Sequence, residues 1–355
     1  MPFTEENRRE LEDNGYTVVE NVLTDTECRQ IIGQFKDWLS TNFAEGEFPH
    51  TAHSLVQRYR VGHLDPAWRV RLKSRDVFAE LWGTNRLLTS VDAVAIGRPP
   101  EDGEEMFAHP DCPNGWLHLD QSPRRQGLHA YQGAVYLEQA DEDDWTFEVL
   151  EGSHRFFDEY YNSNPVAKTR ALARGHMKTR DEHLDWLRLQ GCVQKRVPAP
   201  RGGMLLWRWV VLTCMAPACW ATEKALLTKR TAYNKLLMTT HWPCDDIGLF
   251  PTELPSYGPR ELRPLKRLPE VARSTDAKRL MGVVPYPKPS SGKEKEKEKE
   301  LLAIKPKWHP LYQPDLDDQK KGICSYKCAC ITILVCVFAV LLAASLFMLA
   351  VLSMV

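Results

Sequence analysis

The sequence predicts a mainly β fold with a helical buttress, followed by a membrane-spanning helix. Helical segments near the start are followed by short strand-like runs, an order typical of a β-barrel or sandwich with covering helices. Beyond residue 285 the chain becomes highly charged, and from 328 to 355 it carries no charge. These observations predict a globular domain at 1–285, a linker at 286–327 and a transmembrane tail anchor at 328–355.

The predicted helical buttress lies in the first part of the chain. Residues 4–13, 25–43 and 67–82 place apolar side chains at helical spacing, and Thr24 supplies a capping hydroxyl. A helical insert is expected at 166–190. Strand-like runs occupy 16–23, 87–96, 128–139, 145–152, 195–200, 202–214 and 229–242.

Composition limits the classes of function. With 355 residues, of which 43% are hydrophobic, the chain can bury one sizeable core. Lys and Arg number 46 against 47 Asp and Glu, so the net charge favours no nucleic-acid partner. The charged start, MPFTEENRREL, lacks the apolar run of a signal peptide. We therefore expect a domain that folds in the cytosol and keeps its cysteines as thiols.

The uncharged segment at 328–355 contains the run ITILVCVFAVLLAASLFMLAVL. About 20 apolar residues cross a bilayer as a helix, so the segment predicts a single membrane span. The alternative is a helix buried in the protein core. Lys320, Lys321 and Lys327 precede the span and no charge follows it. By the positive-inside rule, the large domain then faces the cytoplasm.

The linker keeps the predicted span apart from the globular domain. PYPKPSSG carries residues that form turns and extended chain, and KEKEKEKE alternates charge without an apolar face to bury, which predicts a solvated spacer. Cys324, Cys328 and Cys330 lie at the membrane edge. Palmitoylation is one interpretation of these cysteines, and thiols without a role are the other.

A histidine and an aspartate stand two places apart in WLHLDQS, residues 116–122. On a β-strand, His118 and Asp120 share one side while Leu117 and Leu119 share the other. Non-haem Fe(II) oxygenases hold iron with two histidines and one carboxylate, so this pair supplies two of three ligands. The alternative is an ordinary polar pair in a strand.

Several stretches around this pair resemble the phytanoyl-CoA dioxygenase family of Fe(II)- and 2-oxoglutarate-dependent oxygenases. They run through most of residues 10–245 and comprise EDNGYTVVENVLTDTEC, VFAELWGTNRLLTSVDAVAIGRPPE, NGWLHLDQSP, FEVLEGSHRFF, GGMLLW and KRTAYNKLLMTTHWP. The resemblance implies a double-stranded β-helix, or jelly roll, with His118 and Asp120 as the first two iron ligands. It also implies a dioxygenase that uses 2-oxoglutarate and molecular oxygen to hydroxylate its substrate.

The third iron ligand departs from the family pattern. Relatives carry a histidine six residues after the tryptophan that corresponds to Trp207, and here that position is Thr213. A threonine hydroxyl is a poor ligand for Fe(II) compared with imidazole. Three histidines are candidates to replace it. His154 fits a structural role in a loop, His241 fits a strand end, and His129 fits an ordinary strand residue.

The 2-oxoglutarate site is expected on the last strand. The far carboxylate of the co-substrate needs a cation, and a planar guanidinium suits it best. Arg230 resembles the family's arginine, with Lys229 as a weaker competitor and a surface arginine as the alternative. Gln132 is predicted to contact the co-substrate as well, with a residue of the barrel wall as the alternative. Gln121 and Tyr136 are either polar contacts in the pocket or residues of the barrel wall.

Two functions from different classes are consistent with these features. The first is a membrane-anchored Fe(II)- and 2-oxoglutarate-dependent oxygenase that acts on a small or lipid-like substrate, with Thr213 in place of the distal histidine. The second is a catalytically inactive jelly roll that serves as an anchored binding or scaffold protein. A jelly roll without any metal is the remaining interpretation. His118, Asp120 and Arg230 favour the first function, and Thr213 favours the second.

Overall fold

The structure is a computed structural model, and its description covers most of the first two thirds of the chain. The chain divides into two units, Met1–Lys307 and Trp308–Val355, and the elements of the first unit form the fold around the site. The described residues are 3–45, 55–56, 59–91, 94–96, 117–121, 130–144, 146–174, 177–208, 212–213, 218–222, 268–287 and 307–308, with single residues 47, 49, 123, 125, 126, 128 and 292.

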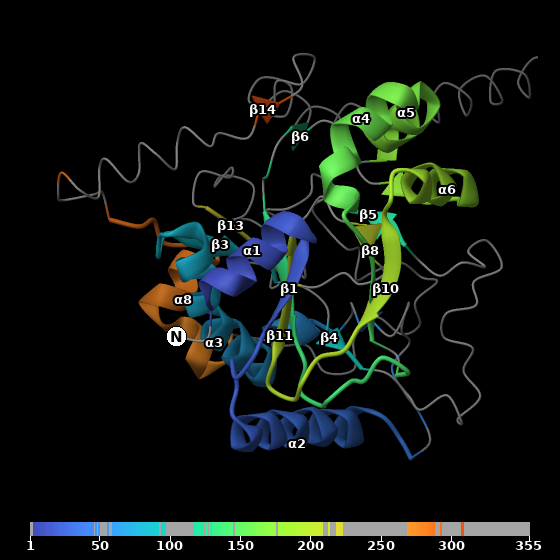
Figure 1. Ribbon diagram of the computed structural model, residues 1–355. Helices are drawn as coiled ribbons and strands as arrows, with labels where there is room; N and C mark the ends of the chain where they lie inside the picture. Colours follow the sequence, from blue (N-terminus) through green and yellow to red (C-terminus); the bar gives the residue numbers. More distant parts are fainter. Residues whose placement is uncertain are drawn as a thin grey trace, which may run out of the picture. The chain divides into compact units, whose positions relative to one another are not determined.

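Two antiparallel five-stranded sheets form the centre of this unit (Figure 1). The first sheet has the order β1 (Tyr16–Val19), β11 (Met204–Arg208), β7 (Tyr131–Val135), β13 (Ala218–Thr222) and β3 (Leu87–Thr89). The second has the order β10 (Val193–Val197), β8 (Phe147–Glu151), β12 (Leu212–Thr213), β5 (His118–Leu119) and β9 (Met177–Lys178).

The pairing of these strands is that of a jelly roll. In chain order, eight strands pair from the outside inwards: β3 with β13, β5 with β12, β7 with β11, and β8 with β10. This nested antiparallel pairing folds one long hairpin into two facing sheets. Strand β1 extends the first sheet beside β11, and β9 extends the second beside β5. The jelly-roll core predicted from the sequence is therefore confirmed.

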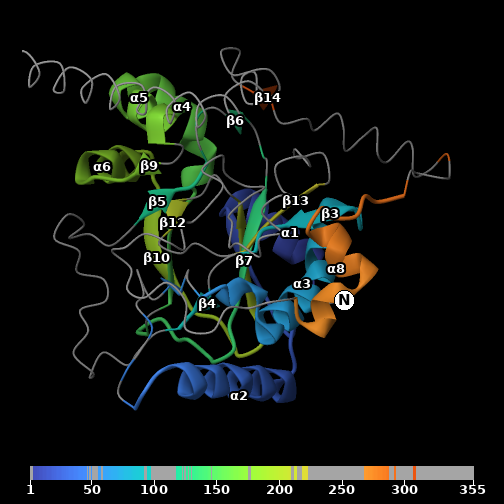
Figure 2. The same cartoon turned by 180° about the vertical axis from the view of Figure 1, so that it is seen from behind.

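Helices α1 (Glu5–Asp13) and α3 (Asp65–Trp82) cover the outer face of the first sheet (Figure 2). Alternation along β11 sends Met204 and Leu206 to this outer face, where they pack with Leu11 and Phe78 of the helices. The other two buried residues of β11, Leu205 and Trp207, pack between the sheets against Phe147 and Val149 of β8. The predicted helical buttress is thus present.

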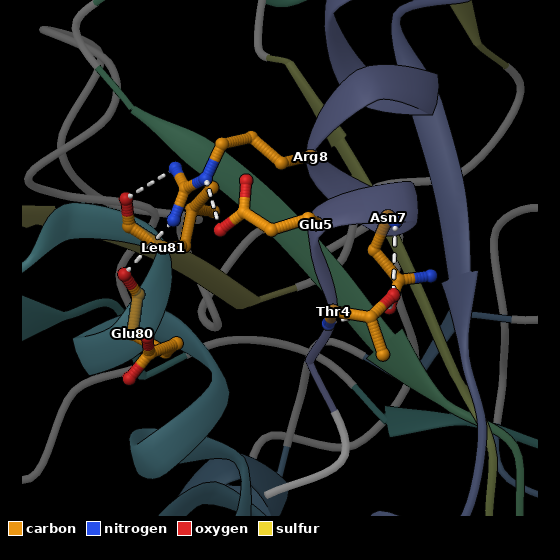
Figure 3. A network of polar contacts seen from close by, with 6 residues as sticks. All are labelled: Thr4, Glu5, Asn7, Arg8, Glu80 and Leu81. Carbon is orange, nitrogen blue, oxygen red and sulfur yellow. Dashed lines mark hydrogen bonds and ion pairs between the residues drawn. The ribbon is translucent and has the colours of Figure 1, made fainter.

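Polar contacts fix the first part of α1 to its surroundings (Figure 3). Thr4 and Asn7 cap the start of α1 reciprocally, since each side chain accepts from the other residue's backbone N–H. The Arg8 guanidinium donates to the backbone oxygens of Leu81 and Glu80, each at 3.3 Å. These are among the last carbonyls of α3, which lack partners within the helix.

Helix α2 (Asp25–Asn42) begins at the residue that the sequence predicts. Thr24 and Glu27 form a capping box, and a hydrogen bond to Lys73 lowers the pKa of Glu27 to about 2. The helix packs Ile31 and Phe35 against a cluster that includes Val56 and Val61. Val56 belongs to β2 (Leu55–Val56), and Val61 belongs to η1 (Val61–His63). Strand β2 pairs with β4 (Val94–Ala95).

A helical insert covers the outer face of the second sheet. It consists of η3 (Ser153–Phe156), α4 (Phe157–Ser163), α5 (Pro165–Arg174) and α6 (Asp181–Leu189). Its buried core joins Tyr160, Tyr161 and Leu184 to Leu117 and Leu150 of the sheet. The insert therefore begins earlier than the predicted 166–190, and β9 lies within it.

A late segment returns to the buttress. Residues 268–287 contain η5 (Glu270–Arg273) and α8 (Thr275–Leu280), whose buried Ala272 and Ala277 pack with Trp68 of α3. The Tyr286 hydroxyl donates to the Leu87 oxygen of β3 at 2.9 Å. This segment therefore belongs to the jelly-roll unit, although no element is expected there from its sequence.

The remaining strand predictions need correction. The sequence predicts one strand at 202–214, but this run provides β11 to the first sheet and β12 to the second. The run at 87–96 provides β3 and β4 in different sheets. The short strands β6 (Arg125–Gln126) and β14 (Lys307–Trp308) complete the described elements.

Several predictions fall outside the described residues. They are the strand at 229–242, the linker from 293 to 300, the span at 328–355, and Cys324, Cys328 and Cys330. Among the helices that the structure does describe, none has the length and apolar character to cross a bilayer.

Candidate functional site

The His-x-Asp pair lies on the inward face of β5. Leu117 and Leu119 pack outward into the core of the helical insert. His118 and Asp120 take the opposite side, as the alternation of a strand requires. Their side chains are 5% and 13% exposed, and His118 Nε2 lies 3.1 Å from Asp120 Oδ1. An imidazole nitrogen and a carboxylate oxygen thus meet between the sheets, where both side chains are largely buried.

Gln132 of the facing sheet holds the aspartate. Its Nε2 donates to Asp120 Oδ2 at 2.8 Å, and the residue is only 1% exposed. Both carboxylate oxygens of Asp120 therefore have a partner, His118 at Oδ1 and Gln132 at Oδ2. A hydrogen bond of this kind orients a metal-binding carboxylate. The structure joins the side-chain amide of Gln132 to Asp120, and its predicted contact with the co-substrate stays a prediction.

Position 213 lies directly across from His118. Thr213 of β12 is the Cα partner of His118 on one side and of Val149 on the other. Val149 is fully buried against Leu205 and Trp207 of the first sheet, so its row faces the interior. Directly opposed residues of antiparallel strands share a face of the sheet. Position 213 thus belongs to the same inward row as His118.

The described residues fit two ligand positions of a facial iron site and do not fit the third. His118 offers Nε2 and Asp120 offers Oδ1 toward the same point. The second Cα partner of His118 is Lys178, so neither neighbour in the row carries an imidazole or a carboxylate. Within the described part of the chain, no three His, Cys, Asp or Glu side chains gather as a metal site.

His154, one of the three candidate replacements, is a structural residue. Its Nε2 contacts the backbone oxygen of Glu12 at 2.9 Å, as a donor in the neutral tautomer, and it thereby ties η3 to the end of α1. Burial lowers the pKa of His154 to about 4, so the ring is neutral at physiological pH. Its predicted structural role in a loop agrees with these contacts.

Tyr136 and Gln121 are the other two polar residues that the sequence offers as pocket or barrel-wall residues. The Tyr136 hydroxyl accepts the backbone N–H of Phe147 at 3.1 Å and lies 3.4 Å from Thr146 Oγ1, which makes it a link between β7 and β8. Gln121 is fully buried beside Asp120. Arg230, Lys229, His129 and His241 lie outside the described residues, and their roles stay predictions.

The site contains one buried donor that the sequence patterns do not single out. Trp207 is the Cα partner of Gln132, is fully buried, and packs at a tilt against Phe147 with ring centroids 4.6 Å apart. Its indole N–H has no acceptor among the residues that the structure describes. The signal for it is the alternation of GGMLLW, which places Leu205 and Trp207 on the same face.

The fold and the site together make this chain a jelly-roll protein with a buried His-x-Asp pair on the inward face of one sheet. No family model matches the chain. Ava biosynthesis cluster protein O of Aspergillus versicolor is 24% identical over 270 residues, which are 66% of this chain and 85% of that protein. The resemblance to the phytanoyl-CoA dioxygenase family therefore stays a prediction.

Solved structures offer a comparison for the fold alone. GIG2 (DUF1479) of Candida albicans superposes with a TM-score of 0.52 and 12% identity, over 84% of this chain and 81% of that chain. This similarity shows the fold. HygX of Streptomyces hygroscopicus, solved with nickel and 2-oxoglutarate bound, gives a TM-score of 0.38 and 13% identity over 62% of this chain and 88% of that chain.

Proposed function

We propose that this protein is an oxygenase of the Fe(II)- and 2-oxoglutarate-dependent class. The observation that carries the proposal is the contact between His118 Nε2 and Asp120 Oδ1, 3.1 Å apart on the inward face of a jelly roll. Both donors suit Fe(II), and the low exposure of the pair limits the access of water. The family resemblance of the surrounding segments supports the same class.

Each residue has a defined role in this proposal. His118 and Asp120 hold the metal, and Gln132 orients Asp120 through its amide. Arg230 is proposed to bind the far carboxylate of 2-oxoglutarate, because a guanidinium pairs with a carboxylate through two hydrogen bonds. In this class the metal and co-substrate supply the oxidising power, and the chain supplies position and a dry interior.

The substrate and location belong to the same proposal. A small or lipid-like molecule near a membrane is the proposed substrate, with the chain anchored through 328–355 and the large domain in the cytoplasm. The support is the uncharged segment together with the lysines before it. A relative named for a biosynthesis cluster is compatible with a small-molecule substrate. Deletion of 328–355 should release the protein from carbonate-washed membranes, whereas persistent attachment would refute the anchor.

The test of the activity is turnover of 2-oxoglutarate by the full-length protein in detergent. With Fe(II), oxygen and ascorbate, we expect release of succinate even without the substrate, at the slow uncoupled rate. His118→Ala and Asp120→Asn should abolish this release. Asp141→Asn is the matched control, because Asp141 is an exposed aspartate that accepts a hydrogen bond from Gln139. Equal release by all four proteins would refute the site.

A second function is favoured by one specific observation. Thr213 stands in the inward row beside His118, where a histidine would complete the ligand set. An incomplete set favours an inactive jelly roll that acts as an anchored binding or scaffold protein. Absence of succinate from a folded wild-type protein that still binds Fe(II) or 2-oxoglutarate would select this function over the oxygenase.

A further inference from the structure

Two arginines share one carboxylate at the interface between α3 and α8. These helices pack together through Trp68 of α3 and Ala277 of α8. Arg75 of α3 places Nη1 3.3 Å from Asp276 Oδ2, and Arg279 of α8 places Nη1 3.3 Å from Asp276 Oδ1. Two positive charges thus meet one negative charge, so this group of three side chains carries one uncompensated positive charge.

Each arginine uses only part of its hydrogen-bonding capacity on Asp276. A guanidinium has five N–H donors, and a bidentate pair places two of them on one partner. Here each guanidinium makes one hydrogen bond to the carboxylate, through Nη1. Among the residues that the structure describes, neither Arg75 nor Arg279 has a second acceptor. Donors of both guanidiniums therefore stay available for a larger anion.

Packing holds the two guanidiniums in place and leaves their ends accessible. The Nε atoms of Arg75 and Arg279 are buried, whereas the side chains as a whole are 23% and 29% exposed. Arg279 also lies over the ring of Tyr286, 5.8 Å from its centroid. A third guanidinium, that of Arg86, lies 5.9 Å from the centroid of the same ring. Since the arginines are ordered without a ligand, binding one costs less entropy.

We propose that Arg75 and Arg279 bind a phosphate monoester, and that Asp276 is an internal anion that competes with it for the two guanidiniums. A phosphate monoester has about −1.5 to −2 charges at pH 7 and three acceptor oxygens, so it satisfies two guanidiniums better than one carboxylate does. Asp276 is 51% exposed, which lets its side chain turn into solvent when the phosphate binds. The interface lies outside the first sheet, so this inference stands without the proposed oxygenase.

The experiment is calorimetric titration of the full-length protein in non-ionic detergent at constant ionic strength. The two probes, glycerol 3-phosphate and dihexanoyl phosphatidic acid, present the same phosphate monoester without and with acyl chains. Wild type should bind saturably. Arg75→Gln and Arg279→Gln should each weaken binding by about tenfold, because each removes a charged fork. Asp276→Asn should tighten binding by about fivefold, because it removes the competing charge.

Arg188 and Asp185 of α6 provide matched controls. They form an ion pair with one arginine and one carboxylate, 3.1 Å apart between Nη1 and Oδ1. Arg188→Gln and Asp185→Asn remove the same charges as the variants at the interface, and neither should change the affinity for either probe by more than about twofold. Circular dichroism establishes that each variant is folded, and the titrations of wild type need no variant.

The two probes also distinguish the sources of the phosphate. Equal affinities would support a soluble phosphate monoester as the ligand, and tighter binding of phosphatidic acid would support a lipid headgroup. Absence of saturable binding of both probes to wild type would overturn the inference. Equal losses in Arg75→Gln and Arg188→Gln would reveal a general effect of charge and would overturn the site. Unchanged affinity in Asp276→Asn would contradict the competition by this carboxylate.

Discussion

Gln132 and Asp120 connect the two sheets of the jelly roll through one hydrogen bond, from Nε2 to Oδ2 at 2.8 Å. Gln132 belongs to β7 of the first sheet, and Asp120 directly follows β5 of the second. The glutamine is 1% exposed, so bulk water does not compete with its amide for the carboxylate. The orientation of the aspartate therefore depends on the distance between the sheets.

Substitution of Gln132 by methionine, which has a similar length and no donor, should weaken metal binding by about 10- to 100-fold. The free energy of unfolding should also fall by roughly 1–3 kcal/mol, since a partly buried carboxylate oxygen loses its partner. Calorimetric titration with Co(II) and urea unfolding measure the two effects. Gln139→Met is the control, because Gln139 donates to Asp141 at 2.9 Å on the surface. Equal effects of both substitutions would contradict the proposed role of Gln132.

Two neighbouring residues of α1 should differ in their effect on stability. Asn7 is 9% exposed and donates to Thr17 Oγ1 and to the Val18 oxygen, besides capping the helix. Its replacement by alanine should cost roughly 2–3 kcal/mol, because several buried polar groups lose partners. Arg8→Ala removes contacts near the surface and should cost less than about 1 kcal/mol. Urea unfolding of both variants checks the order, and the reverse order would be inconsistent with the capping network.

Gly202 should not tolerate a side chain. Its φ of 75° lies in the left-handed region, and a β-carbon would come 2.2 Å from the backbone oxygen of Leu23. Gly202→Ala should therefore destabilise the protein by more than about 2 kcal/mol. Gly33 in α2 has open space around the same position, so Gly33→Ala should stabilise the protein by about 0.5–1 kcal/mol. Thermal unfolding of the two variants tests this contrast, and similar melting temperatures would refute it.

Acid should destabilise the fold through His154. Burial lowers the pKa of His154 to about 4, against about 6.5 for the unfolded chain. Between these values the unfolded chain binds more protons, so this contribution to stability is present above pH 6.5 and is lost as the pH falls toward 4. From pH 7 to pH 5 the loss is about 2 kcal/mol.

The measurement is urea unfolding of wild type and His154→Asn at pH 7 and pH 5. The variant should be less stable at pH 7 because its bond to Glu12 is lost, and it should show a smaller drop at pH 5. His183, whose pKa is also lowered by burial, accounts for part of the remaining drop. An unchanged pH dependence in His154→Asn would exclude this residue as the cause.

Local signals in the sequence predict the helices well. Thr24 and Glu27 cap α2 within four residues of chain, and the apolar spacing of α1 and α3 needs no distant partner to be recognised. The shared side of His118 and Asp120 is likewise a property of one short strand. Such features depend on neighbours in the chain, and the sequence contains them directly.

The exchange of strands between sheets is not a local property. The run at 202–214 is apolar through most of its length, because β11 is buried in one sheet and β12 pairs within the other. Its composition therefore gives no sign of where the chain crosses. The bond between Gln132 and Asp120 escapes prediction for a related reason, since it depends on how the two sheets stack and not on the separation of the residues along the chain.

The nested pairing of strands also has a consequence for biosynthesis. Strand β3 at Leu87–Thr89 takes as its hydrogen-bonding partner β13 at Ala218–Thr222. During synthesis, β3 stays without this partner until the residues up to β13 have been translated. Its backbone amide and carbonyl groups can meanwhile bind to other chains. Contacts so distant along the chain slow folding, so we expect the first sheet to be completed only after β13 has been synthesised.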